Sequence, residues 1–232
     1  MKKQIPNMIT LCNLACGVLS VLAAIGYGFP TQAALLICMG ILFDFFDGMS
    51  ARQLGVSSPM GKELDSLADV VTSGVAPAAI LFELTYNQLF DNGSWWLSIA
   101  FLFIPLFAAY RLAKFNIDPR QSHSFLGLPV PSQALVWVGL ALSQWSNTVC
   151  GSWVGAIVLV SLLLDVLMVS ELPLFSLKFN FKDLSWKANS VQYIFLIVCA
   201  VIIAILRDWI AISVIILWYI ILSLFTQRRH AE

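Results

Sequence analysis

The chain has 232 residues, of which 59% are hydrophobic and 11% are charged, and its 13 basic and 13 acidic residues balance to zero net charge. Soluble domains carry about 25% charged residues, so this composition argues against a soluble globular protein. Disorder requires low hydrophobicity and high net charge, and nucleic-acid binding requires a basic face, so both are disfavoured as well. The class that remains is a polytopic membrane protein.

Eight apolar runs follow one another along the chain. Each run is continuous rather than alternating, and every backbone polar group inside a bilayer needs a partner within the protein, so we expect helices rather than barrel strands. The sequence therefore predicts an all-α membrane helix bundle of eight transmembrane helices that forms a single domain over residues 1–232. The runs lie at about 8–28, 31–52, 62–85, 95–115, 129–146, 152–172, 190–206 and 209–226.

The basic residues indicate how this bundle is oriented, because Lys and Arg are enriched in cytoplasmic loops. With eight spans and an inner N-terminus, Arg207 is the only basic residue on the outer side. We therefore expect cytoplasmic N- and C-termini. The basic residues on the inner side would be Lys2, Lys3, Arg52, Lys62, Arg111, Lys114, Arg120, Lys178, Lys182, Lys187, Arg228 and Arg229.

Four aspartates interrupt two of these apolar runs. Asp44 and Asp47 lie near the end of the second run, and Asp65 and Asp69 lie near the start of the third. A charged side chain at membrane depth costs about 2.5–3.5 kcal/mol on insertion scales. Four of them in such a short stretch require a compensating partner.

Helical spacing indicates what that partner is. Asp44 and Asp47 are three residues apart, and Asp65 and Asp69 are four apart, so each pair shares one helix face. The link at about 53–61 is short, so the two helices are antiparallel neighbours and the four carboxylates can converge near the cytoplasmic interface. Such a cluster is stable only when it is protonated or bound to cations. Hard oxygen ligands favour Mg²⁺ or Mn²⁺, with Ca²⁺ as a further occupant.

Small residues and an arginine accompany the acids. Gly48 and Ala51 leave room beside the backbone, and Arg52 lies one helical turn further towards water, where a guanidinium can hold phosphate. Carboxylates, a divalent metal, a small-residue gap and an arginine together indicate a phosphate-ester site. The alternative is that the small residues pack helices and that Arg52 extends along the membrane surface.

These residues form one pattern, which reads Asp44-x2-Asp47-Gly48-x2-Ala51-Arg52-x8-Gly61-x3-Asp65-x3-Asp69. The pattern resembles the complete signature of the CDP-alcohol phosphotransferases. The resemblance implies an integral-membrane enzyme, usually a homodimer, that moves a phosphatidyl or similar group from a CDP-linked donor to an alcohol. It implies that the metal ligands are Asp44, Asp47, Asp65 and Asp69, that Asp69 also serves as the general base, and that the donor-binding positions are Gly48, Ala51, Arg52 and Gly61.

Further segments are similar to the phosphatidylserine synthase branch of the family. They are residues 5–13, 65–71, 74–78, 111–116 and 125–131. One departure is Thr72-Ser73-Gly74, where that branch has serine, phenylalanine and glycine. The resemblance implies CDP-diacylglycerol as donor and L-serine as acceptor, with phosphatidylserine and CMP as products.

Polar residues near the N-terminus are candidates for binding the donor. Asn7, Thr10 and Asn13 recur at a spacing of three, so they share a helical face. They can hydrogen-bond a nucleotide, or they can cap the first helix.

A second polar group is a candidate for binding serine or phosphate. Arg111 and Lys114 are three residues apart and can meet a phosphate or a substrate carboxylate, although both can also be anchors on the inner side of a span. Ser66 and Asn116 lie in segments that resemble the serine-using branch, and we place them in the same group.

Two alternatives to a serine-using enzyme stay open. The same chemistry can use another acceptor, such as glycerol 3-phosphate or inositol phosphate. Acids inside a membrane can also mark the pathway of an ion-coupled transporter. The acids here cluster on two consecutive helices, and the chain has no internal repeat of the kind that transporters use, so the enzyme is favoured.

Overall fold

The computed structural model describes residues 4–56, 58–117, 127–172 and 186–228, and within these ranges it contains helices and short turns but no strand. The all-α prediction is therefore confirmed. The helices are α1 (Gln4–Val21), α2 (Pro30–Leu54), α3 (Pro59–Asp69), α4 (Ala76–Asp91), α5 (Phe103–Ile117), α6 (Val130–Leu142), α7 (Ser146–Val169), α8 (Trp186–Leu206) and α9 (Ile210–Arg228). Two π-helical turns, η1 (Leu22–Gly26) and η2 (Val70–Val75), and one 3₁₀ segment, η3 (Trp95–Leu102), complete them.

Several of these elements continue one another, so that the described chain forms eight apolar rods. Four rods are long and apolar enough to cross a bilayer: Gln4–Gly26, Pro30–Leu54, Pro59–Asp91 and Trp95–Ile117. The apolar stretches of the other four are Val130–Leu142, Trp153–Val169, Val191–Leu206 and Ile210–Leu224. The chain is therefore an integral membrane protein.

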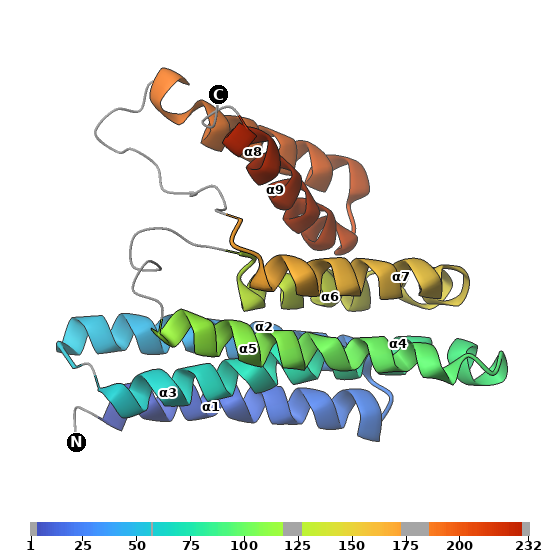
Figure 1. The fold of residues 1–232 in the computed structure, drawn as a ribbon, viewed down its shortest axis with the longest axis horizontal. Coiled ribbons are helices and arrows are strands. Elements are labelled where there is room, and N and C mark those ends of the chain that lie inside the picture. Colours follow the sequence, from blue (N-terminus) through green and yellow to red (C-terminus); the bar gives the residue numbers. More distant parts are fainter. Residues whose placement is uncertain (1–3, 57, 118–126, 173–185, 229–232) are drawn as a thin grey trace.

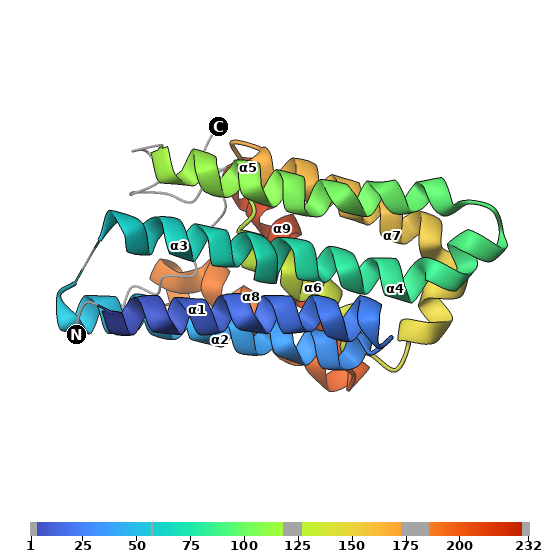
Figure 2. The same cartoon turned by 90° about the horizontal axis from the view of Figure 1, so that it is seen from below.

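The rods pack in layers (Figures 1 and 2). The first five helices run alongside one another, α6 and α7 cover one side of them, and the α8–α9 pair lies inclined beyond α6 and α7. The contacts between these layers are those of α2 with α6, of α5 with α7, and of α9 with α6. The α3–η2–α4 rod lies at the centre, because it contacts α1, α2, α5 and α6.

Short local signals set the sharp turn between α2 and α3. Gly55 ends α2 in the left-handed conformation, with a φ of 62° that favours glycine. The Ser58 side chain then accepts a hydrogen bond from the backbone N–H of Gly61 at 2.9 Å, and Pro59 occupies the first turn of α3. This turn reverses the chain, so α2 runs antiparallel to the α3–η2–α4 rod. The predicted contact between the second and third runs is made at η2 and α4, whereas α3 itself packs against α1 and α5.

The boundaries of the fifth and sixth rods differ from the predicted runs at 129–146 and 152–172. α6 ends at Leu142 because Ser143 adopts an extended ψ of 147° and its Oγ accepts a hydrogen bond from the N–H of Trp145. α7 begins at Ser146 and bends at Trp153, where φ is −120°. Ser143 is a weak breaker of helices, so hydropathy alone carried the fifth run across this turn to residue 146, and it placed the start of the sixth run six residues too late, at 152.

The described basic residues divide between the two ends of the bundle. Arg52, Lys62, Arg111 and Lys114 belong to the end where α2 finishes and α3 begins, whereas Arg207 lies in the turn between α8 and α9 at the other end. This division agrees with the predicted orientation, which stays a prediction. The side chains of the other basic residues on which it depends lie outside the described part: Lys2, Lys3, Arg120, Lys178, Lys182, Lys187, Arg228 and Arg229.

Candidate active site

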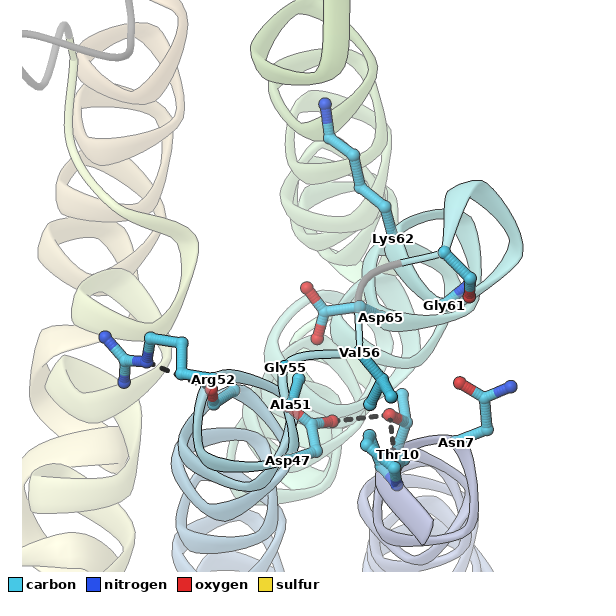
Figure 3. Close-up of a pocket in the computed structure, with 13 residues that line it drawn as sticks. Asn7, Thr10, Asp47, Ala51, Arg52, Gly55, Val56, Gly61, Lys62 and Asp65 are labelled. Atoms are coloured by element: carbon cyan, nitrogen blue, oxygen red, sulfur yellow. Dashed lines mark hydrogen bonds between the residues drawn. The ribbon is translucent and has the colours of Figure 1, made fainter. Parts of the chain in front are cut away.

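A cavity of about 490 Å³ opens at the end of the bundle where α1 starts, α2 ends and α3 starts (Figure 3). Most of the residues singled out in the sequence lie on its wall: Asn7, Thr10, Asp47, Gly48, Ala51, Arg52, Gly61 and Asp65. Residues that the sequence did not single out also line it: Pro6, Gly55, Val56, Ser58 and Lys62. Gly55, Val56, Ser58 and Lys62 lie in or beside the 53–61 link, which was the available signal for them, and Pro6 lies beside Asn7 on α1.

Three of the four aspartates meet beside this cavity. One carboxylate oxygen each from Asp44, Asp47 and Asp65 lies within 4.8 Å of the other two. Two oxygens bound to one ion at about 2.0–2.6 Å lie up to about 4–5 Å apart, so this spacing suits a shared divalent cation after little adjustment. Asp47 is buried, with 6% of its surface exposed, so its charge needs such a partner.

The hydroxyl of Thr10 fixes one of these ligands. Thr10 Oγ1 donates a hydrogen bond to Asp47 Oδ2 at 2.5 Å and also lies 3.0 Å from the carbonyl oxygen of Pro6. Thr10 is buried, and its contact joins the start of α1 to the end of α2. Thr10 therefore orients a candidate metal ligand, besides lining the cavity.

Asp69 lies one helical turn deeper than Asp65 and does not line the cavity. It is buried, and its Oδ1 accepts a hydrogen bond from Asn13 Nδ2 at 3.2 Å. The guanidinium of Arg111 on α5 interacts electrostatically with Asp69. Directly after Asp69 the helix widens into the π-helical η2, a distortion frequent at functional sites.

The glycines of the signature play different structural roles. A Cβ atom added to Gly48 would meet no described atom within 4 Å, so this glycine keeps open space in the cavity wall and does not pack helices. A Cβ atom added to Gly61 would lie 3.0 Å from Ser58 Oγ and 3.1 Å from Asn7 Oδ1. Gly61 thus allows Asn7 and the Ser58 cap to approach the start of α3.

Arg52 points away from the acids. Its Nε donates a hydrogen bond to the carbonyl of Gly48 at 3.0 Å, and Figure 3 shows its guanidinium on the side of α2 opposite Asp65. The side chain is exposed, so it can rotate towards a phosphate without breaking a buried contact. The sequence placed Arg52 on the correct helix but could not give this orientation.

The candidates for serine or phosphate binding divide into two groups. Asn116 Nδ2 donates to Ser66 Oγ at 2.9 Å, and the carbonyl of Asn116 accepts from Lys62 Nζ at 2.9 Å, so these residues tie the end of α5 to α3. Lys114 pairs with Glu171 at 3.1 Å on the exposed surface. Only Arg111 is buried and faces Asp69, with its guanidinium 5.9 Å from the ring centre of Phe115.

The arrangement therefore combines three carboxylates that can hold a divalent cation, a cavity with open space beside Gly48, and a buried carboxylate next to them. Divalent cations held by carboxylates commonly bind phosphate groups of a substrate. A buried carboxylate beside such a site can accept a proton from an attacking hydroxyl.

Residues 3–167 match the model of the CDP-alcohol phosphatidyltransferase family, and the chain belongs to this family. The match covers α1 to α6 and most of α7, and α8 and α9 follow it.

The chain is similar to curated proteins named CDP-diacylglycerol–serine O-phosphatidyltransferase. The Bacillus subtilis (strain 168) protein is 37% identical over 139 residues, which are 60% of this chain and 76% of that protein. The Helicobacter pylori (strain 26695) protein is 35% identical over 187 residues, covering 78% of this chain and 74% of the relative. The Methanocaldococcus jannaschii protein is 36% identical over 168 residues, covering 72% of each.

Proposed function

We propose that the protein transfers the phosphatidyl group of CDP-diacylglycerol to the hydroxyl of L-serine, giving phosphatidylserine and CMP. The observation that carries the proposal is the meeting of Asp44, Asp47 and Asp65 within 4.8 Å beside a cavity of about 490 Å³, with Asp69 buried one turn deeper. The names of the curated relatives support serine as the acceptor.

The metal ligands in this proposal are Asp44, Asp47 and Asp65, with Asp69 completing the set. A bound Mg²⁺ or Mn²⁺ would supply positive charge to offset that of the donor's phosphates. Ca²⁺ is a further occupant. The donor set supports this group of cations, because the site offers only oxygen ligands.

Asp69 acts as the general base. It accepts the proton of the serine hydroxyl as the serine oxygen forms a bond to the phosphorus of the phosphatidyl group. The bond from that phosphorus to the oxygen of CMP breaks, and CMP leaves with the electron pair.

The donor occupies the cavity. The open space beside Gly48 and Ala51 admits its pyrophosphate close to the α2 backbone, and Arg52 turns in to bind a phosphate. Asn7 presents its amide on the opposite wall, next to Gly61. Arg111 is the best placed of the described cations to bind the serine carboxylate, because it faces Asp69 from α5. Ser66, Lys114 and Asn116 have partners within the protein and do not line the cavity, so their role here is to hold α5 beside α3 and beside Glu171.

We propose that residues 1–232 work as one membrane unit, with the site facing the cytoplasm of a bacterial-type inner membrane and with a second copy forming a homodimer. The four described cations at the site end of the bundle support the orientation. The resemblance to the family supports the dimer, and light scattering of the detergent-purified protein measures it.

A CMP-release assay tests the reaction. The purified protein is given CDP-diacylglycerol in mixed micelles, with Mg²⁺ or Mn²⁺ and one alcohol at a time: L-serine, glycerol 3-phosphate, inositol or inositol phosphate. We expect CMP release with serine and loss of release on addition of EDTA. Release with another alcohol and not with serine would overturn the assignment of the acceptor.

Two aspartate variants test the role of the acids. Asp69→Asn should abolish release while the protein stays folded, because an amide cannot accept the proton. Asp165→Asn is the matched control: Asp165 is also buried in a helix, but it lies on α7 and hydrogen-bonds to Gln133. The Asp165→Asn protein should retain CMP release. Normal turnover by Asp69→Asn would show that Asp69 is not the general base.

A further inference from the structure

Asn13 is a completely enclosed polar residue next to the acids. None of its surface is exposed, and it does not line the cavity. Its side-chain nitrogen donates to Asp69 Oδ1 at 3.2 Å, across the contact between α1 and the end of α3. This position differs from that of Asn7, which shares its helix face in the sequence and does line the cavity.

The surroundings hold Asn13 in one place. Thr72 Oγ1 in η2 donates to the backbone carbonyl of Asn13 at 3.0 Å. Two glycines make this approach possible, because a Cβ atom on Gly17 or on Gly40 would lie 2.5 Å from the side chain of Thr72. The three segments α1, α2 and η2 therefore close around Asn13 at a distance that larger residues would prevent.

The direction of the Asn13 amide follows from its neighbours. Its oxygen points to α2, 2.8 Å from where a Cβ atom on Gly40 would lie, and it has no hydrogen-bond partner among the described residues. The reverse orientation would place that oxygen against the carboxylate of Asp69, which is repulsive. The side-chain N–H of Asn13 therefore donates its hydrogen bond to Asp69.

We propose that Asn13 is a positioning residue, which holds the carboxylate of Asp69 in the orientation for accepting the acceptor's proton, and that it does not bind the donor. The inference rests on the proposed function. Fixing Oδ1 limits rotation of the carboxylate, so that Oδ2 keeps one direction relative to Asp44, Asp47 and Asp65. Residues that orient a ligand or base through one hydrogen bond commonly change activity by about 10–100-fold when they are removed.

Steady-state kinetics of Asn13→Leu distinguish positioning from donor binding. Leucine has the same branched arrangement of side-chain heavy atoms, although it is bulkier, and it donates no hydrogen bond. We expect kcat to fall by about 10–100-fold, with the KM for CDP-diacylglycerol and the calorimetric affinity for CDP unchanged. A higher KM and weaker CDP binding at unchanged kcat would show that Asn13 is a donor ligand and would overturn the inference, as would unchanged kinetics.

Ser20→Ala is the matched control. Ser20 lies on the same helix, is equally enclosed, and its hydroxyl bonds to the carbonyl of Ala33 at 2.8 Å, far along α1 from the acids. This variant should lose thermal stability and keep its kcat. If Asn13→Leu does not fold, Asn13→Ala, which only removes atoms, gives the same comparison.

The outcome for Asn13 is separable from the outcome for the proposed function. The kinetics are measured with whichever alcohol supports CMP release by the unmodified protein. A different acceptor would change the proposed function and leave the role of Asn13 to be decided by the ratio of kcat values. Full turnover by a folded Asn13→Leu would contradict the role of Asn13 alone.

Discussion

Gln133 of α6 donates a hydrogen bond from Nε2 to Oδ1 of Asp165 on α7, at 2.6 Å, and both side chains are almost completely buried. Asp165 is an isolated acid in an apolar run of the sequence, where no local spacing points to a role. The hydrogen bond with Gln133 gives Asp165 a structural role, because it joins α6 to α7 inside the bundle and away from the candidate active site.

We predict that Gln133→Leu destabilises the protein more than Asp165→Leu does. The first variant leaves a buried carboxylate without its donor, whereas the second leaves a buried amide, at a cost of about 1–3 kcal/mol. Asp165→Asn should be tolerated, because asparagine keeps an acceptor for Gln133. Thermal unfolding in detergent measures the order.

The double variant Gln133→Leu/Asp165→Leu checks the pairing. It should be more stable than Gln133→Leu, since it leaves neither buried group unpaired. Additive losses in the double variant would show that the two residues stabilise the protein independently.

Gly127 provides a second stability test, at the segment that leads into α6. Its φ of 72° favours glycine, and a Cβ atom there would lie 2.4 Å from the carbonyl oxygen of Met168 and 2.7 Å from that of Ser170. Both contacts are with backbone, which cannot move aside alone. Gly127→Ala should therefore cost more than the about 1–2 kcal/mol of the backbone conformation alone.

Gly155→Ala is the control for this variant. Gly155 lies within α7, and a Cβ atom there would meet no described atom within 4 Å. Alanine is a better helix former by about 1 kcal/mol, so this variant should unfold at the same or a higher temperature. Equal melting temperatures for the two variants would contradict the reading of Gly127.

The sequence predicted the parts of the site that depend on local geometry. Asp44, Asp47 and Asp65 meet because spacings of three and four residues share a helix face, and because Gly55 and Pro59 shorten the turn between the helices. These relations extend over one or two turns of helix, so residue order suffices to find them.

The sequence could not predict contacts that depend on how far helices approach one another. The Asn13–Asp69 bond requires α1, α2 and η2 to close around Thr72, which Gly17 and Gly40 permit. Either glycine alone reads as an ordinary small residue in an apolar run. The partner of Asp165 was hidden for the same reason, because Gln133 lies 32 residues away in the chain.

Thr10 should control the metal requirement. Thr10→Val keeps the shape of the side chain and removes the hydrogen bond to Asp47, so Asp47 is less well oriented. We expect about 10–100-fold more Mn²⁺ to be needed for half-maximal CMP release. Thr85→Val is the control, because the Thr85 hydroxyl is buried and bonds to Leu81 of its own helix at 2.7 Å. A Mn²⁺ titration in which both variants match the unmodified protein would contradict the role of Thr10.

Gly48 should control access of the donor. Gly48→Leu fills the open space in the cavity wall and introduces a better helix former. We expect a higher KM for CDP-diacylglycerol, with no loss of thermal stability. A Gly48→Leu protein with an unchanged KM would show that the donor does not approach this part of α2.

Asp208 gives a prediction about pH, at the opposite end of the bundle. Its carboxylate accepts hydrogen bonds from the backbone N–H groups of Ile210, at 2.9 Å, and Gln144, at 3.1 Å, so it ties the α8–α9 turn to the α6–α7 turn. These hydrogen bonds hold the pKa of Asp208 below its ordinary value, and the bond from Ile210 has the largest effect. A lowered pKa in the folded state means that folding favours the ionised form. The stabilisation is therefore complete at pH values above the ordinary aspartate pKa of about 4, which applies to the unfolded chain. It is lost as the pH falls through the lowered pKa of the folded protein.

Thermal unfolding between about pH 6 and about pH 3 measures this loss, as the difference between the unmodified protein and Asp208→Asn. Asparagine keeps one acceptor but cannot accept both bonds as a carboxylate does, and it does not titrate. The difference in melting temperature should be largest near pH 6 and should shrink towards pH 3. Asp91→Asn, which removes an exposed acid at the end of α4, controls for the loss of one carboxylate. A difference in melting temperature that stays constant with pH would mean that ionisation of Asp208 does not stabilise the contact between the two turns.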